Sequence, residues 1–340
     1  MTAGPDLDAV IASIARPDEQ ARRAARERLS AGAPRGRLDE LAAWLAGVQG
    51  ASPARPIGQV RLLLLTADHG VTEADVSGHA AGDTQSLVRD TLTGSSPLAA
   101  VAASVGVSVR PEALSPDTPG ARVDQADAMS VDDARAAVLR GVAIVDEEVD
   151  GGTDLLVLAD VGRGVGTVAS ALVGILTRRD ASVVTSSGAG IDDARWMRRC
   201  AVVRDAMRRG RPLLGDHVAV LATIGGPDLA TATGILLGAA ARRTPVVLDG
   251  IATAAAALVA QRMSFRAVDW WLAGHRSPEP AHAIALDRLG LKPALDLGIR
   301  REDGTGALLA VPVLRAAAAD FAVTDPPPAA DPDRPPAPAN

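Results

Sequence analysis

The sequence predicts an α/β fold in which a mainly parallel, Rossmann-like sheet is flanked by helices. The evidence is a recurring pattern: a short apolar run, then a turn with Gly and Asp, then an alanine-rich helix. The pattern is seen four times, in "GQVRLLLLTADHG", "TDLLVLADVGRGVG", "HVAVLATIGGPDLA" and "TPVVLDGIATAAAAL". Short, fully apolar runs are typical of parallel strands buried on both faces. In such sheets ligands bind beyond the carboxyl ends of the strands, where these turns lie.

The two ends of the chain have a different pattern and predict a second domain. The stretches "DLDAVIASIARPDEQARRAARERLS" and "GRLDELAAWLAGVQG" are rich in helix formers, and residues from 265 onward indicate two or three more helices. We therefore expect an α/β nucleotide-binding domain over residues 58–264 and a small helical domain formed by 1–57 and 265–324. The proline-rich tail, residues 325–340, is expected to be disordered.

Composition limits the function classes. The chain has 340 residues and a net charge of −6, which argues against a nucleic-acid partner. The single cysteine, Cys200, excludes an internal disulfide and a thiolate zinc site. No basic, apolar leader is present at the N-terminus, and no run of about 18 uninterrupted apolar residues occurs. We expect a cytoplasmic protein without a membrane partner.

Two glycine-rich stretches are candidates for phosphate binding. "DVGRGVGT" begins at Asp160 and ends at Thr167, and it lacks the Gly-Lys-Ser/Thr of a Walker loop. Its glycines allow backbone N–H groups to approach a phosphate, or they serve only a tight strand-to-helix turn. "SSGAGIDDARWMRRC" has a second glycine pair and then acids typical of a helix N-terminus. Arg198 and Arg199 follow and either contact a phosphate or are solvated.

Two other stretches carry polar residues at expected loop positions. In "ADHGV", Asp68 and His69 follow a strand, and the acid serves either catalysis or the N–H groups of its own loop. No second histidine stands at metal-ligand spacing, so no metal site is expected. In "GHRSPEPAH", Ser277 before Pro278 predicts a helix N-terminus rather than a catalytic serine. The absence of Gly-x-Ser-x-Gly argues against a hydrolase, and the absence of a full dinucleotide fingerprint argues against an oxidoreductase.

Taken together, several of these stretches resemble the nicotinate-nucleotide:dimethylbenzimidazole phosphoribosyltransferase family of cobalamin lower-ligand synthesis. The resemblance covers about residues 30–320 and is carried by "ADHGV", "SSGAGIDD", "GGPDLATATGILLGAAARRTPVVLDG", "GHRSPEPAHAIALDRLGL" and "LDLGIRREDGTGALLAVPVLRAA", in this order. It implies a homodimer of α/β subunits with a small helical domain made from both chain ends. It also implies transfer of phosphoribose from nicotinate mononucleotide to a benzimidazole nitrogen, with inversion at the anomeric carbon and without a cofactor or metal.

The resemblance assigns roles to individual positions. The family base, a glutamate after Leu-Gly and before Gly-Thr/Ser-Gly, aligns with Asp303, whose side chain is one methylene shorter; Glu302 stands where the family has glycine. The expected phosphoribose site consists of Asp160, Gly162, Gly164, Thr167, Gly188, Gly190 and Arg199. The expected pocket for the acceptor base consists of Asp68, His69, Ser77 and Ser86.

Departures from the family pattern cluster at the expected site. Asp160 replaces a glutamate, and Val165 and Gly166 replace an Asn and a Thr that donate hydrogen bonds. Phosphoribosyl transfer is the expected function. A catalytically impaired homologue, acting as a nucleotide-binding or regulatory protein, is the alternative.

Overall fold

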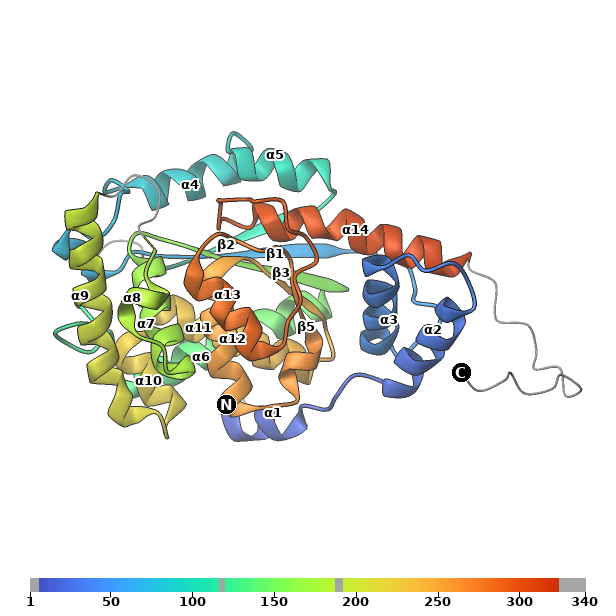
Figure 1. Cartoon of the computed structure of the whole chain (residues 1–340), viewed down its shortest axis with the longest axis horizontal. Helices are drawn as coiled ribbons and strands as arrows, with labels where there is room; N and C mark the ends of the chain where they lie inside the picture. Colours follow the sequence, from blue (N-terminus) through green and yellow to red (C-terminus); the bar gives the residue numbers. More distant parts are fainter. Residues whose placement is uncertain (1–5, 116–119, 187–191, 324–340) are drawn as a thin grey trace, which may run out of the picture. The chain divides into compact units, whose positions relative to one another are not determined.

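The computed structural model of the chain describes residues 6–115, 120–186 and 192–323 (Figure 1). Within this part of the chain lies a five-stranded, all-parallel sheet in the order β2-β1-β3-β4-β5. The strands are β1 (Val60–Ala67), β2 (Ser108–Ser115), β3 (Leu155–Val161), β4 (Val246–Leu248) and β5 (Trp271–Ala273). This confirms the α/β prediction, and the 2-1-3-4-5 order is one of the two common doubly wound arrangements.

Helices precede, separate and follow the strands along the chain. The α-helices are α1 (Leu7–Ser13), α2 (Glu19–Ser30), α3 (Arg37–Gln49), α4 (Asp83–Leu92), α5 (Pro97–Ser104), α6 (Val131–Asp150), α7 (Val165–Thr177), α8 (Ala181–Val184), α9 (Asp193–Gly210), α10 (His217–Ile224), α11 (Pro227–Ala241), α12 (Gly250–Met263), α13 (Pro280–Leu289) and α14 (Thr305–Ala322). Short 3-10 turns are η1 (Gly70–Ala74), η2 (Arg211–Leu213) and η3 (Ala267–Trp270). In Figure 1, α4 and α5 lie on one side of the sheet and α7, α11 and α12 on the other.

The two central strands form the core because their sequences are apolar on both faces. Leu62, Leu63, Leu64 and Leu65 of β1 are fully buried, as are residues 156–159 of β3. The parallel register of β1 and β3 brings Thr66 level with Val161. Both strands therefore end at the same edge of the sheet, and the loops that follow them, beginning at residues 68 and 162, are neighbours.

Three predicted or missed elements need correction. Residues 217–224, predicted as a strand, form helix α10, where the side chain of Asp216 accepts a hydrogen bond from the N–H of Ala219 (3.0 Å). An eight-residue apolar run does not distinguish a strand from a buried helix, and this N-cap decides it. Strands β2 and β5 were not predicted: β2 contains Pro111 and charged residues at a sheet edge, and β5 is three residues long.

The chain divides into two compact units. The larger comprises residues 1–16 and 57–312, and the smaller comprises 17–56 and 313–340. Residues 265–312 lie in the larger unit, whereas the sequence pattern groups them with the chain ends. The reason is that Trp271 of β5 pairs with Val246 of β4 and its side chain is buried.

In the smaller unit, α2 begins at an Asp18 cap that accepts a hydrogen bond from the N–H of Ala21 (2.8 Å). Arg35 Nε lies 2.8 Å from Asp320 Oδ2 there. The boundary between the units falls at Pro312, inside α14.

Helix α14 is the one helix in the described residues that is long and apolar enough, by length and composition, to cross a membrane. Half of its apolar window is buried within the protein. Core helices of folded proteins pass the same test, so the finding is weak evidence for a membrane span.

Candidate functional site

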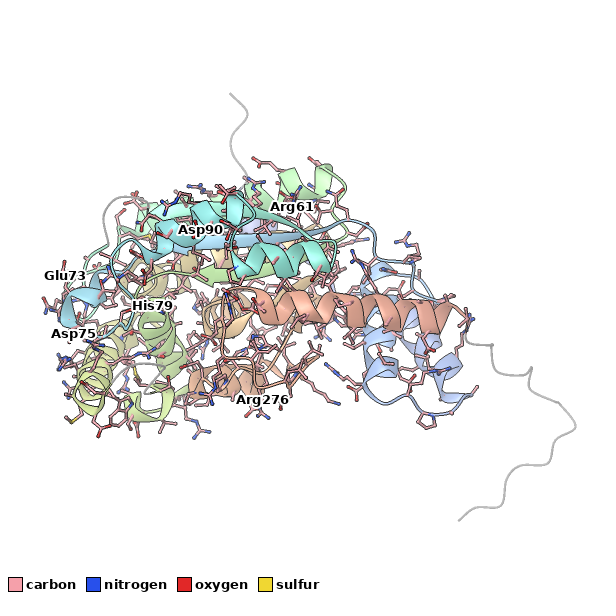
Figure 2. The ribbon with its side chains drawn as sticks, turned by 90° about the horizontal axis from the view of Figure 1, so that it is seen from above. Arg61, Glu73, Asp75, His79, Asp90 and Arg276 are labelled. Carbon is pink, nitrogen blue, oxygen red and sulfur yellow. The ribbon has the colours of Figure 1, made fainter. Side chains whose placement is uncertain are left out.

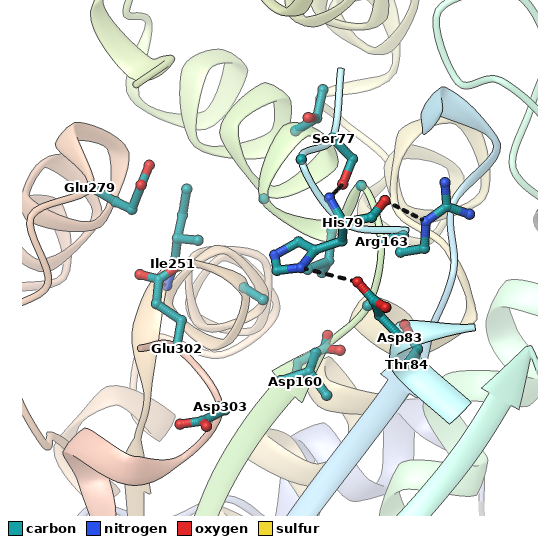
Figure 3. Close-up of a pocket in the computed structure, with 18 of the residues that line it drawn as sticks. Ser77, His79, Asp83, Thr84, Asp160, Arg163, Ile251, Glu279, Glu302 and Asp303 are labelled. Carbon is teal, nitrogen blue, oxygen red and sulfur yellow. Dashed lines mark hydrogen bonds and ion pairs between the residues drawn. The ribbon is translucent and has the colours of Figure 1, made fainter. Parts of the chain in front are cut away.

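A cavity of about 560 Å³ lies at the carboxyl edge of the sheet, where the loops after β1 and β3 diverge (Figure 3). Its volume is within the range of small-molecule sites, and its place is the switch point at which doubly wound sheets bind ligands. Residues 76–79, 83–84 and 87, which follow β1, line one side of the cavity, and the end of β3 with the loop after it contributes residues 160–167. The remaining lining residues are Arg199 of α9, Ile251 and Ala252 of α12, Glu279, and the loop 300–303.

One end of the cavity is suited to an anion. Helix α7 begins there, and its N-terminus carries a partial positive charge. Arg199 reaches the same place from α9, and its Nε donates to Thr167 Oγ1 (3.1 Å). Burial lowers the pKa of Arg199, while the carboxylates of Glu279 and Glu302 raise it. Arg199 lines the cavity, its Nη1 lies 3.5 Å from the carbonyl oxygen of Ser186, and no ion pair joins it to another residue of the described ranges.

Each glycine of the loop after β3 is favoured at its position for a different physical reason. A Cβ on Gly162 would stand 1.6 Å from the carbonyl oxygen of Ala67, so the glycine allows β1 and this loop to touch. Gly164 has φ +86°, a conformation that favours glycine. A Cβ on Gly166 would lie 3.0 Å from Arg199 Nη2, so Gly166 leaves space for the guanidinium. Close backbone packing therefore requires glycine at position 162, and space for the Arg199 side chain at the anion end of the cavity favours glycine at position 166.

Two carboxylates of one loop line the other part of the cavity, and they have different partners. Asp303 Oδ2 accepts hydrogen bonds from Arg301 Nη2 (2.6 Å) and Nε (3.0 Å), and its Oδ1 accepts from the N–H of Thr305 (3.1 Å). Glu302 Oε1 accepts from Ser277 Oγ (2.7 Å) and from the N–H of Ile251 (3.2 Å). Asp303 is therefore paired with a cation, and Glu302 is held by neutral donors.

The loop that carries these acids is anchored to the end of β4. The carboxylate of Asp249 accepts hydrogen bonds from the N–H of Gly304 (2.9 Å) and of Ala307 (2.8 Å). His275 Nε2 lies 3.3 Å from Asp249 Oδ1, and a Cβ on Gly306 would meet the His275 ring at 2.2 Å. Gly304 and Gly306 thus fit the start of α14 against Asp249 and His275, which fixes where residues 302 and 303 lie.

Three buried ionisable groups form a cluster beneath the cavity. His69 Nε2 lies 2.8 Å from Asp228 Oδ2. Burial lowers the pKa of His69, but the Asp228 carboxylate raises it, and the net shift is upward. Burial, and then the nearby Asp228 carboxylate, raise the pKa of Asp160 well above its usual value. Asp160 is therefore the acid of this cluster whose protonated form burial favours.

The comparisons with known proteins agree on one family. The family model described as Phosphoribosyltransferase matches residues 14–324. Nicotinate-nucleotide–dimethylbenzimidazole phosphoribosyltransferase of Streptomyces avermitilis is 48% identical over 92% of this chain and 89% of its own. The enzyme of the same name from Mycobacterium avium is 43% identical over 91% and 93%. The chain belongs to the nicotinate-nucleotide–dimethylbenzimidazole phosphoribosyltransferase family.

A solved structure agrees with this assignment. The crystal structure of CobT from Thermus thermophilus matches with a TM-score of 0.84 at 32% identity, covering 89% of this chain and 96% of that one. The recognition made from sequence motifs is confirmed, and this member of the family is a pentosyltransferase by type.

The structure places the predicted site residues of this phosphoribosyltransferase in three groups. The cavity is lined by Asp303, Asp160, Gly162, Gly164, Thr167, Arg199 and Ser77. The described residues that lie outside the lining are Asp68, His69 and Ser86. Gly188 and Gly190 fall outside the described residues.

The residues outside the lining have structural partners. Asp68 Oδ1 accepts from Thr84 Oγ1 (2.6 Å) and from the N–H of Arg163 (2.9 Å), so it joins the loops after β1 and β3. Ser86 accepts from Arg89 Nη2 (2.9 Å).

Several lining residues were not found from the sequence. His79 and Thr84 line the cavity on the side of β1, and Glu279 lies on the opposite side with Glu302 (Figure 3). Ser277 was expected to begin a helix, but α13 begins at Pro280 and the Ser277 hydroxyl binds Glu302 instead. The "SPEP" stretch contains two pairs in which a polar residue precedes proline, Ser277-Pro278 and Glu279-Pro280. The second pair begins the helix, with Glu279 as the N-cap and Pro280 as its first residue.

Proposed function

We propose that this chain transfers phosphoribose from nicotinate mononucleotide to a benzimidazole-type base. A ring nitrogen of the acceptor forms a bond to the anomeric carbon as the bond from that carbon to the nicotinate nitrogen breaks. The electron pair of the broken bond stays on the nicotinate ring, which leaves uncharged at its nitrogen. The acceptor loses its other N–H proton to a carboxylate of the protein, which acts as general base.

The observation that carries the proposal is that a guanidinium and two acids open into one cavity. Arg199 and the N-terminus of α7 offer positive charge for the phosphate. Glu302 and Asp303 line the same cavity and offer a carboxylate for the proton. Holding donor and acceptor together in such a space supplies much of the rate enhancement, since the pyridinium is already a good leaving group.

Individual roles are part of the proposal. Asp160, Gly162, Gly164, Thr167 and Arg199 form the phosphoribose end of the cavity, and Ser77 lies on the acceptor side. The reaction uses no metal or organic cofactor. A homodimer in the cytoplasm is proposed on the family resemblance, and light scattering of the purified protein measures the oligomeric state.

A matched pair of arginine variants tests the phosphate end. Arg198 neighbours Arg199 but is ion-paired with Asp75, which lies on the surface next to α9 (Figure 2). Arg199→Gln is expected to lower kcat/KM for nicotinate mononucleotide by about 10- to 100-fold, because a charge-assisted contact is lost. Arg198→Gln should change it less than about 3-fold. Equal effects of both variants on nicotinate release contradict the proposed phosphate site.

A further inference from the structure

We propose that Glu302, not the residue aligned with the family base, is the general base of this chain, and that Ser277 positions its carboxylate. The inference rests on the proposed function. It assigns the proton transfer to a residue at a position where the family pattern has glycine.

Both carboxylate oxygens of Asp303 are engaged by donors from residues of its own loop and the start of α14. Arg301 donates two hydrogen bonds to Oδ2, at 2.6 and 3.0 Å, and the N–H of Thr305 occupies Oδ1 at 3.1 Å. Protonation of Asp303 would remove the charge that holds Arg301. Arg301 itself stands where the family pattern has leucine.

Glu302 has the geometry of a base. Its Oε1 is held by Ser277 and Ile251, while no hydrogen bond joins its Oε2 to another described residue. Its side chain packs on Gly250, where an added Cβ would come within 2.9 Å of Glu302 Cβ. The half-buried carboxylate therefore has one oxygen fixed and one oxygen available at the cavity wall (Figure 3).

The charges around Glu302 suit it to accept a proton near neutral pH. Burial raises the pKa of Glu302 to about 7, with further upward contributions from Glu279 and Asp249, while the bonds from Ser277 and Ile251 lower it. Arg199 of α9 and His275 also face it as cationic or titratable neighbours. A base whose pKa is close to the working pH is both available and strong enough to act.

Ser277 stabilises the ionised form of Glu302. Its hydroxyl lies 2.7 Å from Glu302 Oε1 and 3.0 Å from Nδ1 of His282. Burial lowers the pKa of His282 to about 3, so the ring is neutral, and Nδ1 accepts a bond from the N–H of Ser277 (3.2 Å). The hydroxyl donates to ionised Glu302. The acceptor's proton goes to Oε2, the oxygen without a hydrogen bond to another described residue, while Ser277 and Ile251 keep Oε1 in place.

The first experiment compares Glu302→Gln with Asp303→Asn, using nicotinate release from nicotinate mononucleotide with dimethylbenzimidazole. Glu302→Gln is expected to lower kcat by at least about 100-fold, the usual size of a general-base effect. Asp303→Asn is expected to cost less than about 10-fold. A Glu302→Gln variant as fast as the parent, or a larger loss in Asp303→Asn, overturns the inference. An inactive parent protein instead contradicts the proposed function itself.

The second experiment follows the pH dependence of kcat and is independent of whether Glu302→Gln folds. The parent should lose activity as the pH falls through about 7, because the base becomes protonated. Ser277→Ala removes a bond to the ionised form, so this acid limb should move to higher pH, and Ser277→Thr should restore it. Glu279→Gln removes a facing negative charge, so the limb should move to lower pH. Acid limbs that stay in place in both Ser277→Ala and Glu279→Gln overturn the inference, since a purely structural role would leave them unmoved.

Discussion

Arg301 and Asp303 form an ion pair, 2.6 Å from Nη2 to Oδ2, in the loop where the family pattern places its base. The arginine is half exposed, with 49% of its side chain accessible, whereas the side chain of Asp303 is 12% accessible. Water therefore screens the pair, and its contribution to folding is modest. The pair determines which carboxylate of the loop remains available for chemistry.

For Asp303→Asn we expect the free energy of unfolding to fall by about 1 kcal/mol or less. The amide oxygen still accepts from the N–H of Thr305, and only the ion pair with Arg301 is lost. Urea unfolding of the parent and the variant measures the difference. A loss well above this size would mean that the ion pair is essential to the fold of the loop, and the variant would then be a poor test of catalysis.

For Asp160→Asn we expect a smaller decline of stability with rising pH. The folded-state pKa of Asp160 is raised above the unfolded value, so the folded protein binds this proton more tightly. Its contribution is present at low pH and is lost as the pH rises through the folded pKa. Asparagine mimics the protonated acid beside Asp228 at every pH. Melting temperatures at about pH 5 and about pH 8 should therefore differ less in the variant. An unchanged difference contradicts the raised pKa of Asp160.

For Gly162→Ala we expect a loss of roughly 1–3 kcal/mol of stability or a failure to fold, as for overpacked positions. The new methyl group would meet the carbonyl oxygen of Ala67 at 1.6 Å, and neither backbone can move without disturbing β1 or β3. Gly215→Ala is the matched control, since nothing lies within 4 Å of its added Cβ. A Gly162→Ala protein as stable as the control would show that the loop after β3 has room to shift.

The parts of the fold that depend on local sequence could be predicted. The leucine run of β1 and the apolar run of β3 are unbroken, so both strands were found. The run at residues 217–224 is equally apolar but forms α10, and the Asp216 N-cap is the local signal that marks it as a helix. Strand β5 is too short to show a period, and only its pairing with β4 defines it.

The site was predictable where one motif carries it and not where distant segments meet. Asp160 and Thr167 belong to one glycine-rich turn. Arg199 is distant in sequence, and α9 places its guanidinium within hydrogen-bond distance of Thr167 in that turn. The environment of Glu302 depends on Ser277 and Ile251, which lie in other loops, and on the Asp249 anchor after β4. No local pattern in "REDGTG" encodes those contacts, so only the family resemblance, which favours Asp303, ranks the two adjacent acids.

The most direct test measures whether the protein releases nicotinate and forms the new ribosyl phosphate in equal amounts. The parent protein is incubated with nicotinate mononucleotide, with and without 5,6-dimethylbenzimidazole, and nicotinate and the new ribosyl phosphate are quantified together. We expect both products in equal amounts and only when the acceptor is present. A rise in melting temperature with nicotinate mononucleotide but no product, the behaviour of an impaired homologue that only binds its ligand, would contradict the assignment of phosphoribosyl transfer to this chain.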